Sequence, residues 1–204
     1  MLKIWGRINS VNVKKALWCL DELGLEYQRT DAGMQFGVVN TPEYRKMNPN
    51  GLVPTMEEDG YILWESHSIV RYLSAKYGKG VLWPMDARTR GVSNQWMDWA
   101  FSFQGSVRDA FWNLIRTPAE KRDAKAIEAS RLKSGEMARI LDAALADRMY
   151  VAGPFSMGEI PIGCEVQRWM RLPMERPKLP NLEAWFERLG ARTAFKKHVD
   201  LPLT

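Results

Sequence analysis

The sequence reads Asn48-Pro49-Asn50-Gly51-Leu52-Val53-Pro54 and then, after a short interval, Tyr61-Ile62-Leu63-Trp64-Glu65-Ser66-His67-Ser68, and this stretch decides the fold. An X-Pro bond can be cis at modest cost where a loop meets an apolar run, as at Val53-Pro54. The backbone N–H and C=O of Val53 would then turn outward, free to pair with an extended peptide. Glu65 and Ser66 open a helical pattern, and an acid and a hydroxyl beside free helix-start N–H groups suit an amino-acid head group. The stretch therefore predicts a small-peptide site.

The residues before this stretch predict a βαβ unit. Leu2-Lys3-Ile4-Trp5 alternates like a short strand, and residues 25–30 read as a second strand. Between the two strands, good N-cap residues at 9–12 precede apolar residues at helical spacing. A strand, a helix and a strand in so short a span favour parallel pairing of the strands. The connection 31–47 contains at most one helical turn, near 42–44.

The residues after Pro54 predict a hairpin and a helix. Residues 55–58 and 61–64 flank Asp59-Gly60, a dipeptide that strongly favours a two-residue hairpin turn. Apolar residues at helical spacing then run from 69 to 77. The order of elements up to this point is βαβ(α)ββα.

The remaining sequence predicts helices alone. One helical pattern spans 87–115, and Thr117-Pro118-Ala119-Glu120 has the form of a helix start leading to a helix that ends near 147. Ser156 and Glu159 have the spacing of a capping box, which we interpret as structural. A last helix includes 182–186, with a tail after Gly190.

Composition and charge exclude several classes of protein. The chain has 204 residues, a net charge of +5 and a pI near 9.2, but its basic residues are interspersed with acids, so we interpret the charge as a solvated surface and expect no nucleic-acid partner. No apolar run is long enough to cross a membrane and no secretory signal is visible, which predicts a cytoplasmic protein. Cys19 and Cys164 have neither CxxC nor zinc-ligand spacing, so we expect reduced, buried thiols and no metal.

The Asn-Pro-x-Gly-x-Val-Pro array at 48–54, the Glu-Ser pair at 65–66 and the capping segment at 150–163 resemble the cytosolic glutathione transferase superfamily, in particular its bacterial, theta-like and beta-like classes. The resemblance covers nearly the whole chain. It implies a glutathione transferase that activates glutathione as a thiolate for attack on a hydrophobic electrophile or a peroxide. It also implies a homodimer that uses glutathione as a co-substrate, with no cofactor.

The fold implied by the resemblance combines an α/β part with an all-α part. A thioredoxin-like domain, βαβαββα, would occupy residues 1–78 and bind glutathione. A linker would follow at 79–87. An all-helical domain at 88–204 would contribute the electrophile site.

The first helix start lacks a thiol, which bears on the chemistry. Redox members of the thioredoxin-like fold carry CxxC there, but this chain has Asn9-Ser10-Val11-Asn12, so the ligand must supply the sulfur. A hydroxyl or amide donor and the positive end of a helix both stabilise a thiolate, and Lys14 and Lys15 add positive charge. By resemblance Ser10 corresponds to the serine of theta-like classes, while Asn12 matches an asparagine that some bacterial members use. A simpler role for Ser10 is to cap its helix.

The resemblance also assigns the glutathione contacts. Glu65 and Ser66 would hold the γ-glutamyl end, while the loop residues Leu52, Val53 and Pro54 would contact the rest of the peptide, Val53 through its backbone. The family often has Lys or Gln at the position of Leu52. The glycyl carboxylate therefore needs another partner, for which Lys46 and Asn50 are the candidates.

The electrophile pocket is the least constrained part of the site. Phe103 and Trp112 on the long helix, with Phe195 in the tail, could line it, although an aromatic stripe at helical spacing also suits a core. His67 is expected to pack or to face solvent. Two other functions stay open: a glutathione-dependent disulfide reductase or peroxidase, and a non-catalytic binding protein with the same fold.

Overall fold

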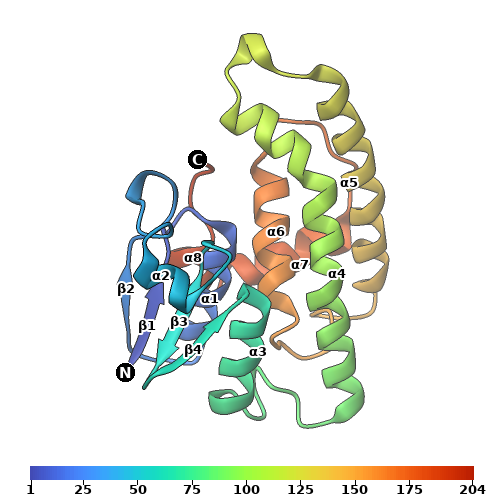
Figure 1. Ribbon diagram of the computed structural model, residues 1–204. Coiled ribbons are helices and arrows are strands. Elements are labelled where there is room, and N and C mark those ends of the chain that lie inside the picture. The colour runs from blue at the N-terminus through green and yellow to red at the C-terminus, as the bar shows by residue number, and fades with distance from the viewer.

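A computed structural model describes all residues, 1–204, and begins with the βαβ unit (Figure 1). The strand β1 (Leu2–Trp5) is followed by the helix α1 (Val11–Glu22) and by β2 (Tyr27–Thr30). The two strands pair in parallel, as the sequence predicts. The second strand begins two residues later than expected, because Leu25 still belongs to the turn, where its N–H donates to the carbonyl of Leu20.

The predicted hairpin completes a four-stranded mixed sheet of order β2-β1-β3-β4. The strands β3 (Thr55–Glu58) and β4 (Tyr61–Trp64) pair antiparallel around Asp59 and Gly60. Both turn residues have positive φ, 49° and 87°, which is the backbone of a type I′ turn. The Asp-Gly signal thus predicts the turn correctly.

The strand register brings distant segments to one edge of the sheet. Trp5, the last residue of β1, pairs with Thr30 on one side and with Thr55 on the other. Thr55 in turn pairs with Trp64, the last residue of β4. The turn after β1, the loop before β3 and the start of the helix after β4 therefore meet at the same edge.

Helices surround the sheet and then form the rest of the molecule. The predicted turn near residue 42 is a short helix, α2, capped by Thr41, and a 3₁₀ turn precedes it. The helices α1 and α3 contact each other, and α4 and α5 lie side by side. The elements not yet described are η1 (Met34–Phe36), α2 (Pro42–Met47), α3 (Ser66–Tyr77), α4 (Ala87–Phe111), η2 (Trp112–Arg116), η3 (Ala119–Lys121), α5 (Ala124–Ala144), α6 (Glu159–Arg171), α7 (Pro180–Gly190) and α8 (Thr193–His198).

This arrangement confirms the predicted fold class, an α/β thioredoxin-like part followed by a helical part. The division at residues 78 and 88 stays a prediction, although a loop does join α3 to α4. No helix has both the length and the apolarity needed to cross a membrane.

Three helix boundaries differ from the sequence prediction. The long helix is α-helical only to Phe111 and continues as a π-helical turn. The next helix does not begin at Pro118, because Asp123 caps it by accepting hydrogen bonds from the N–H groups of Lys125 and Ala126. Residues after Gly190 are not a simple tail, because Thr193–His198 form α8.

The predicted capping box at Ser156 and Glu159 is not formed. Ser156 Oγ accepts a hydrogen bond from the Gly158 N–H (3.3 Å), as expected of a residue near a helix start. The Glu159 carboxylate does not return to Ser156 but accepts from the Val151 N–H (2.9 Å) and from the Trp185 indole (2.7 Å). Glu159 is fully buried, and this burial raises its pKa to about 8. It therefore joins α6 to α7.

One hydrophobic core runs through both halves of the molecule. It includes Trp18 of α1 and Trp169 and Ile162 of α6. A Cβ atom added at Gly163 would lie 2.9 Å from both Trp18 and Leu189, so the absence of a side chain lets α6 approach α1 and α7 closely. The core fixes the sheet edge relative to the helices.

Candidate active site

The loop before β3 has the expected backbone. The Val53-Pro54 peptide bond is cis, the isomer that the sequence permits. The N–H and C=O groups of Val53 make no hydrogen bond within the protein, so both are available to a ligand. Val53 lies against the turn after β1, since a Cβ atom at Gly6 would be 3.3 Å from the Val53 Cβ.

Buried polar groups fix the same loop from beneath. The Leu52 carbonyl accepts hydrogen bonds from the Tyr44 hydroxyl (2.7 Å) and from the Asn48 amide (3.0 Å). Asn48 also donates to Thr55 (3.1 Å), the first residue of β3. The Leu52 side chain is 63% exposed, and Lys46 and Asn50 are exposed near it. The loop backbone is therefore held in place while these three side chains face solvent.

The start of α3 carries an unusual backbone conformation. Glu65 precedes the helix with φ 72° and ψ 113°, values that a non-glycine residue rarely adopts. Its side chain is exposed and makes no capping hydrogen bond, whereas Ser66 is 4% exposed. Such conformations are found where the surrounding structure enforces them, often at ligand sites.

Ser10 precedes α1 at the N-cap position. Its carbonyl accepts the first bond of the helix, from the Lys14 N–H (2.9 Å), but its hydroxyl makes no capping hydrogen bond. The simple capping role of the side chain is therefore not realised. The hydroxyl remains available to donate a hydrogen bond beside the positive end of the helix.

A chain of buried polar side chains links the starts of α1 and α3. The Lys15 ammonium contacts the side-chain amide oxygen of Asn12 (3.0 Å), His67 Nε2 (3.1 Å) and the Glu165 carboxylate of α6 (2.9 Å). Because the oxygen of Asn12 is engaged by Lys15, its NH₂ group remains free to donate. Burial, together with the nearby charges of Lys15 and Arg71, lowers the pKa of His67 to about 2, so this imidazole is neutral.

The sequence suggests that Lys14 and Lys15 add positive charge at the start of α1, but both side chains are buried and engaged by other groups. The ammonium of Lys15 is compensated by Glu165, and both side chains are fully buried. Lys14 donates to the carbonyl of Val199 (3.2 Å). Burial lowers the pKa of Lys14 from its usual value.

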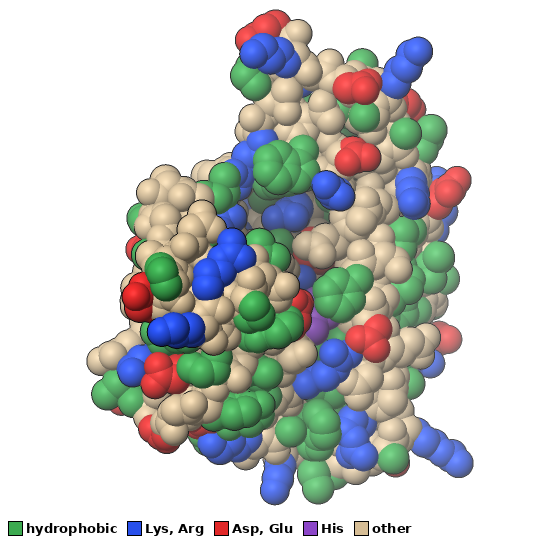
Figure 2. Space-filling model, viewed as in Figure 1, with side chains coloured by type: hydrophobic (Ala, Val, Ile, Leu, Met, Phe, Trp, Pro, Cys, Tyr) green, Lys and Arg blue, Asp and Glu red, His purple; other side chains and the backbone are tan.

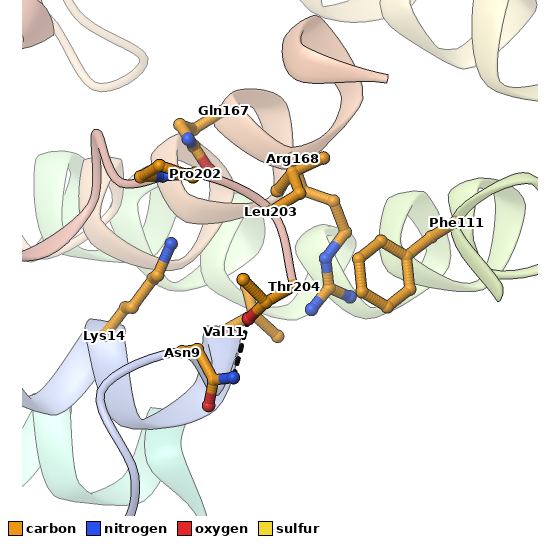
Figure 3. A pocket seen from close by; sticks show the side chains of 9 residues that line it. All are labelled: Asn9, Val11, Lys14, Phe111, Gln167, Arg168, Pro202, Leu203 and Thr204. Carbon is orange, nitrogen blue, oxygen red and sulfur yellow. Dashed lines mark hydrogen bonds between the residues drawn. The ribbon is translucent and has the colours of Figure 1, made fainter. Parts of the chain in front are cut away.

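A hollow lies beside the start of α1. Figure 2 shows it between the sheet-containing half and the long helices, with Lys and Arg side chains in and around it. Figure 3 shows Lys14 of α1, Arg168 of α6 and Phe111 of α4 around a pocket closed by the C-terminal residues. There the Asn9 amide donates to the Thr204 hydroxyl (2.6 Å). A second cavity of about 290 Å³ adjoins it, lined by Arg7, Ile8, Asn9, Arg29, Asp31, Gln35, Phe36 and Thr204.

Two of the three proposed pocket aromatics belong to the core. Phe103 has no exposed surface and packs against Trp99 and Trp169, with ring centroids 5.5 and 6.1 Å away. Phe195 is likewise buried against Trp18 (5.0 Å). The prediction that Phe103 or Phe195 lines a pocket is wrong, because both rings face the core. Trp112, in the π-helical turn, is 49% exposed and stays a candidate.

The structure adds side chains that the sequence did not suggest. Arg7, Phe111, Arg116 and Arg168 come from three separate segments, since Phe111 and Arg116 share one continuous helix, and the tertiary structure brings these segments together. His67 was expected to pack or to face solvent, and it packs against Phe101 with centroids 4.0 Å apart.

Neither cysteine of the chain can take part in chemistry at this site. Cys19 and Cys164 are free and fully buried, as predicted. Burial raises the pKa of each thiol to about 12. Neither can serve as a thiolate, so a reacting sulfur must come from a ligand.

Comparisons with known proteins agree with this geometry. Residues 1–75 match the family described as "Glutathione S-transferase, N-terminal domain". The chain is 39% identical to glutathione S-transferase GstB of Escherichia coli K12, with 100% of both chains covered. It is 26% identical to the probable glutathione S-transferase GSTF1 of Oryza sativa subsp. japonica, covering 96% of this chain and 94% of that one.

A solved structure is similar throughout. The theta class glutathione S-transferase from Xanthomonas axonopodis pv. citri, determined with glutathione bound, superposes with a TM-score of 0.96 at 46% identity, covering 100% of this chain and 99% of that chain. These relatives cover 96% or more of this chain, whose cis-proline loop and two helix starts lie at one edge of the sheet. The chain belongs to the glutathione S-transferase family.

Proposed function

We propose that this protein is a glutathione transferase that binds glutathione at the sheet edge formed by the Val53 loop and the starts of α1 and α3. The bound thiol is activated as a thiolate and attacks a hydrophobic electrophile or a peroxide. The proposal rests on the Ser10 hydroxyl, which lies at a helix start but makes no capping hydrogen bond, in a protein with no reactive thiol of its own.

The proposed contacts divide glutathione into three parts. The Glu65 carboxylate takes the γ-glutamyl ammonium, and the Ser66 hydroxyl and N–H take its carboxylate. The unpaired backbone of Val53, next to Pro54, pairs with the cysteinyl residue, which is supported by the absence of any internal partner for these groups.

The glycyl carboxylate then extends along the exposed part of the loop. Lys46 and Asn50 are its proposed partners, beside Leu52, since all three side chains are exposed there. Lys46 offers a charge, whereas Asn50 offers amide donors. If Lys46→Ala lowers the affinity for glutathione and Asn50→Ala does not, the contact with the glycyl carboxylate belongs to Lys46.

Activation depends on a hydrogen-bond donor to the sulfur. Ser10 is the first candidate because its hydroxyl is free, and Asn12 is the second because Lys15 leaves its NH₂ group unengaged. A donor together with the positive end of α1 favours the thiolate over the thiol. No proton-transfer triad is needed, and catalysis comes from the lowered thiol pKa and from positioning.

We expect Ser10→Ala to raise the pKa of bound glutathione and to reduce turnover at neutral pH by about 10-fold or more, because a charge-assisted hydrogen bond contributes about 1.5–3 kcal/mol. The measurement is a titration of thiolate ultraviolet absorbance in the glutathione complex. Ser102→Ala, an exposed serine on α4, is the matched control. An unchanged titration in Ser10→Ala would transfer the role to Asn12, which Asn12→Ala then tests.

Calorimetry with glutathione tests the proposal as a whole, since failure to bind at millimolar concentration would leave only a non-catalytic role for the fold. Comparing conjugation with disulfide-exchange turnover separates a transferase from a reductase. The homodimer and the cytoplasmic location are further proposals taken from the family, and sedimentation tests the former.

A further inference from the structure

Three arginines lie around the cavities beside the start of α1. Arg168 lines the pocket that the C-terminal residues close, and Arg7 lines the adjoining cavity. Arg116 lies close enough to Arg7 for their charges to interact. Arg7 follows β1, Arg116 ends the π-helical turn and Arg168 lies on α6. Arg168 and Arg116 both lie against the ring of Phe111, at 4.1 and 5.6 Å from its centroid. The Arg7 and Arg116 side chains both reach the segment at Gly33 and Met34, where Arg116 contacts the Met34 sulfur at 3.4 Å.

The cluster lacks enough negative charge. Arg168 is 3.8 Å from the Glu165 carboxylate, but that carboxylate already pairs with Lys15 at 2.9 Å. Arg7 and Arg116 form no ion pair, and the Nε atom of each is buried without a hydrogen-bond partner. The nearby acids are engaged elsewhere, Asp31 with Arg29 and Asp200 with Arg171.

Like charges in a partly desolvated hollow repel one another. Burial and the charges of Arg116 and Arg168 lower the pKa of Arg7 from its usual value, and burial lowers that of Arg168. Guanidinium groups present donors that suit a carboxylate, and such a cluster is relieved when an anion binds. The half-exposed ring of Trp112 lies beside this cluster, with the Arg116 guanidinium 5.8 Å from its centroid.

We propose that Arg7, Arg116 and Arg168 form a subsite for the negatively charged end of the electrophile, so that the co-substrate is a carboxylate-bearing alkylating compound. The inference rests on the proposed function, because the glutathione thiolate at Ser10 must be the nucleophile. The arginines bind the carboxylate of such a compound, and the glutathione thiolate lies at Ser10 beside them. The reacting carbon of the compound therefore lies between its own carboxylate and the thiolate. The exposed ring of Trp112 contacts its carbon frame, while Phe111 supports the arginines from the core.

A matched pair of substrates isolates the charge. The probes are 4-(bromomethyl)benzoate and 4-(bromomethyl)benzamide, which share the same reacting carbon. In both, the thiolate sulfur forms a bond to the benzylic carbon while the carbon–bromine bond breaks and bromide leaves with the electron pair. The thiol proton goes to solvent. After correction for the uncatalysed rates, we expect kcat/KM to favour the benzoate by about 10-fold or more, as one charge-assisted contact allows.

Variants then assign the preference to the cluster. Arg116→Gln and Arg7→Gln should each lower kcat/KM for the benzoate about 10-fold more than for the benzamide. Arg116→Lys should retain part of the preference. Arg139→Gln on α5 removes the same charge from an exposed position and should leave both rates unchanged. Circular dichroism checks that each variant is folded.

A binding measurement separates this inference from the proposed function. The unreactive 4-methylbenzoate should bind the glutathione complex more tightly than 4-methylbenzamide, and Arg116→Gln should abolish the difference. Turnover of the benzamide without any preference for the benzoate would overturn the inference alone. Equal losses with both substrates in the arginine variants would also overturn it, because the cluster would then act on the thiolate. Failure of both probes, with no thiolate formed, would overturn the proposed function and this inference with it.

Discussion

Lys15 is the residue on which three parts of the site depend. It contacts Asn12 on its own helix, His67 at the start of α3 and Glu165 on α6, and it has no exposed surface. A buried ion pair is costly to form, but removing one partner alone leaves an uncompensated charge in the interior. Lys15 therefore holds both halves of the site in position through a contact that tolerates little change.

We expect Lys15→Met to lower the free energy of unfolding by about 3 kcal/mol, because the buried Glu165 would lose its closer cation and keep only Arg168, at 3.8 Å. Urea denaturation measures the loss. The double variant Lys15→Met/Glu165→Leu removes both charges and should recover much of it. Equal stability of the single and double variants would contradict this explanation.

At the scale of elements, α6 is positioned by the glycine in its second turn. Gly163 faces Trp18 of α1 and Leu189 of α7, and a Cβ atom there would lie 2.9 Å from each side chain. These neighbours are fully buried and packed on all sides, so they have little room to move. The distance between α6 and α1 therefore depends on this residue.

Gly163→Ala should destabilise the protein by about 1–3 kcal/mol through overpacking, even though alanine is the better helix former. Thermal or urea unfolding measures the change. Gly105→Ala on α4 has open space around its Cβ position and is the control that should be neutral or stabilising. A stabilised Gly163→Ala variant would show that α6 can shift without cost.

The elements also show what local sequence can and cannot predict. The Asp59-Gly60 turn follows from the residues at those positions, because short-range backbone preferences decide it. The residues at Val53-Pro54 permit a cis bond, but local preference favours trans, so the surrounding structure selects the cis isomer. The start of α5 was misplaced because Thr117-Pro118 and Asp123 are both plausible caps, and tertiary contacts select between them. Sequence spacing likewise cannot tell whether an aromatic stripe faces the core or a pocket, so Phe103 was misassigned.

The candidate site shows the same division. Ser10, Glu65 and Ser66 could be proposed because they adjoin recognisable helix starts. Arg116 and Arg168 could not, because they lie on separate helices and come together only where Arg168 of α6 packs on Phe111, next to Arg116. Long-range convergence of this kind carries no local signal.

At the scale of the whole molecule, Glu159 makes stability depend on pH. Burial raises its pKa to about 8, against about 4.5 for an unperturbed carboxyl. Between these values the unfolded chain has released a proton that the folded protein keeps, so the contribution to stability falls as pH rises and is lost on passing about pH 8. The neutral His67 acts in the opposite direction only below its unperturbed pKa of 6.5.

Between about pH 6.5 and pH 8, we therefore expect the wild type to lose stability relative to Glu159→Gln as pH rises, by up to about 1.4 kcal/mol per pH unit. Urea denaturation of both proteins across this window measures the difference. The glutamine side chain keeps the shape but cannot ionise. A difference that does not vary with pH would show that Glu159 is already ionised in the folded protein.

The burial of Cys19 and Cys164 has a consequence for an enzyme of this kind. Soft alkylating compounds react with any accessible thiolate, and a catalyst that gathers them could be consumed by them. Here the two thiols of the chain are enclosed and remain protonated at physiological pH, whereas the only activated sulfur arrives and departs with the co-substrate. In the proposed reaction each turnover thus uses a new glutathione sulfur, and the buried thiols of the protein are protected from alkylation by its substrates.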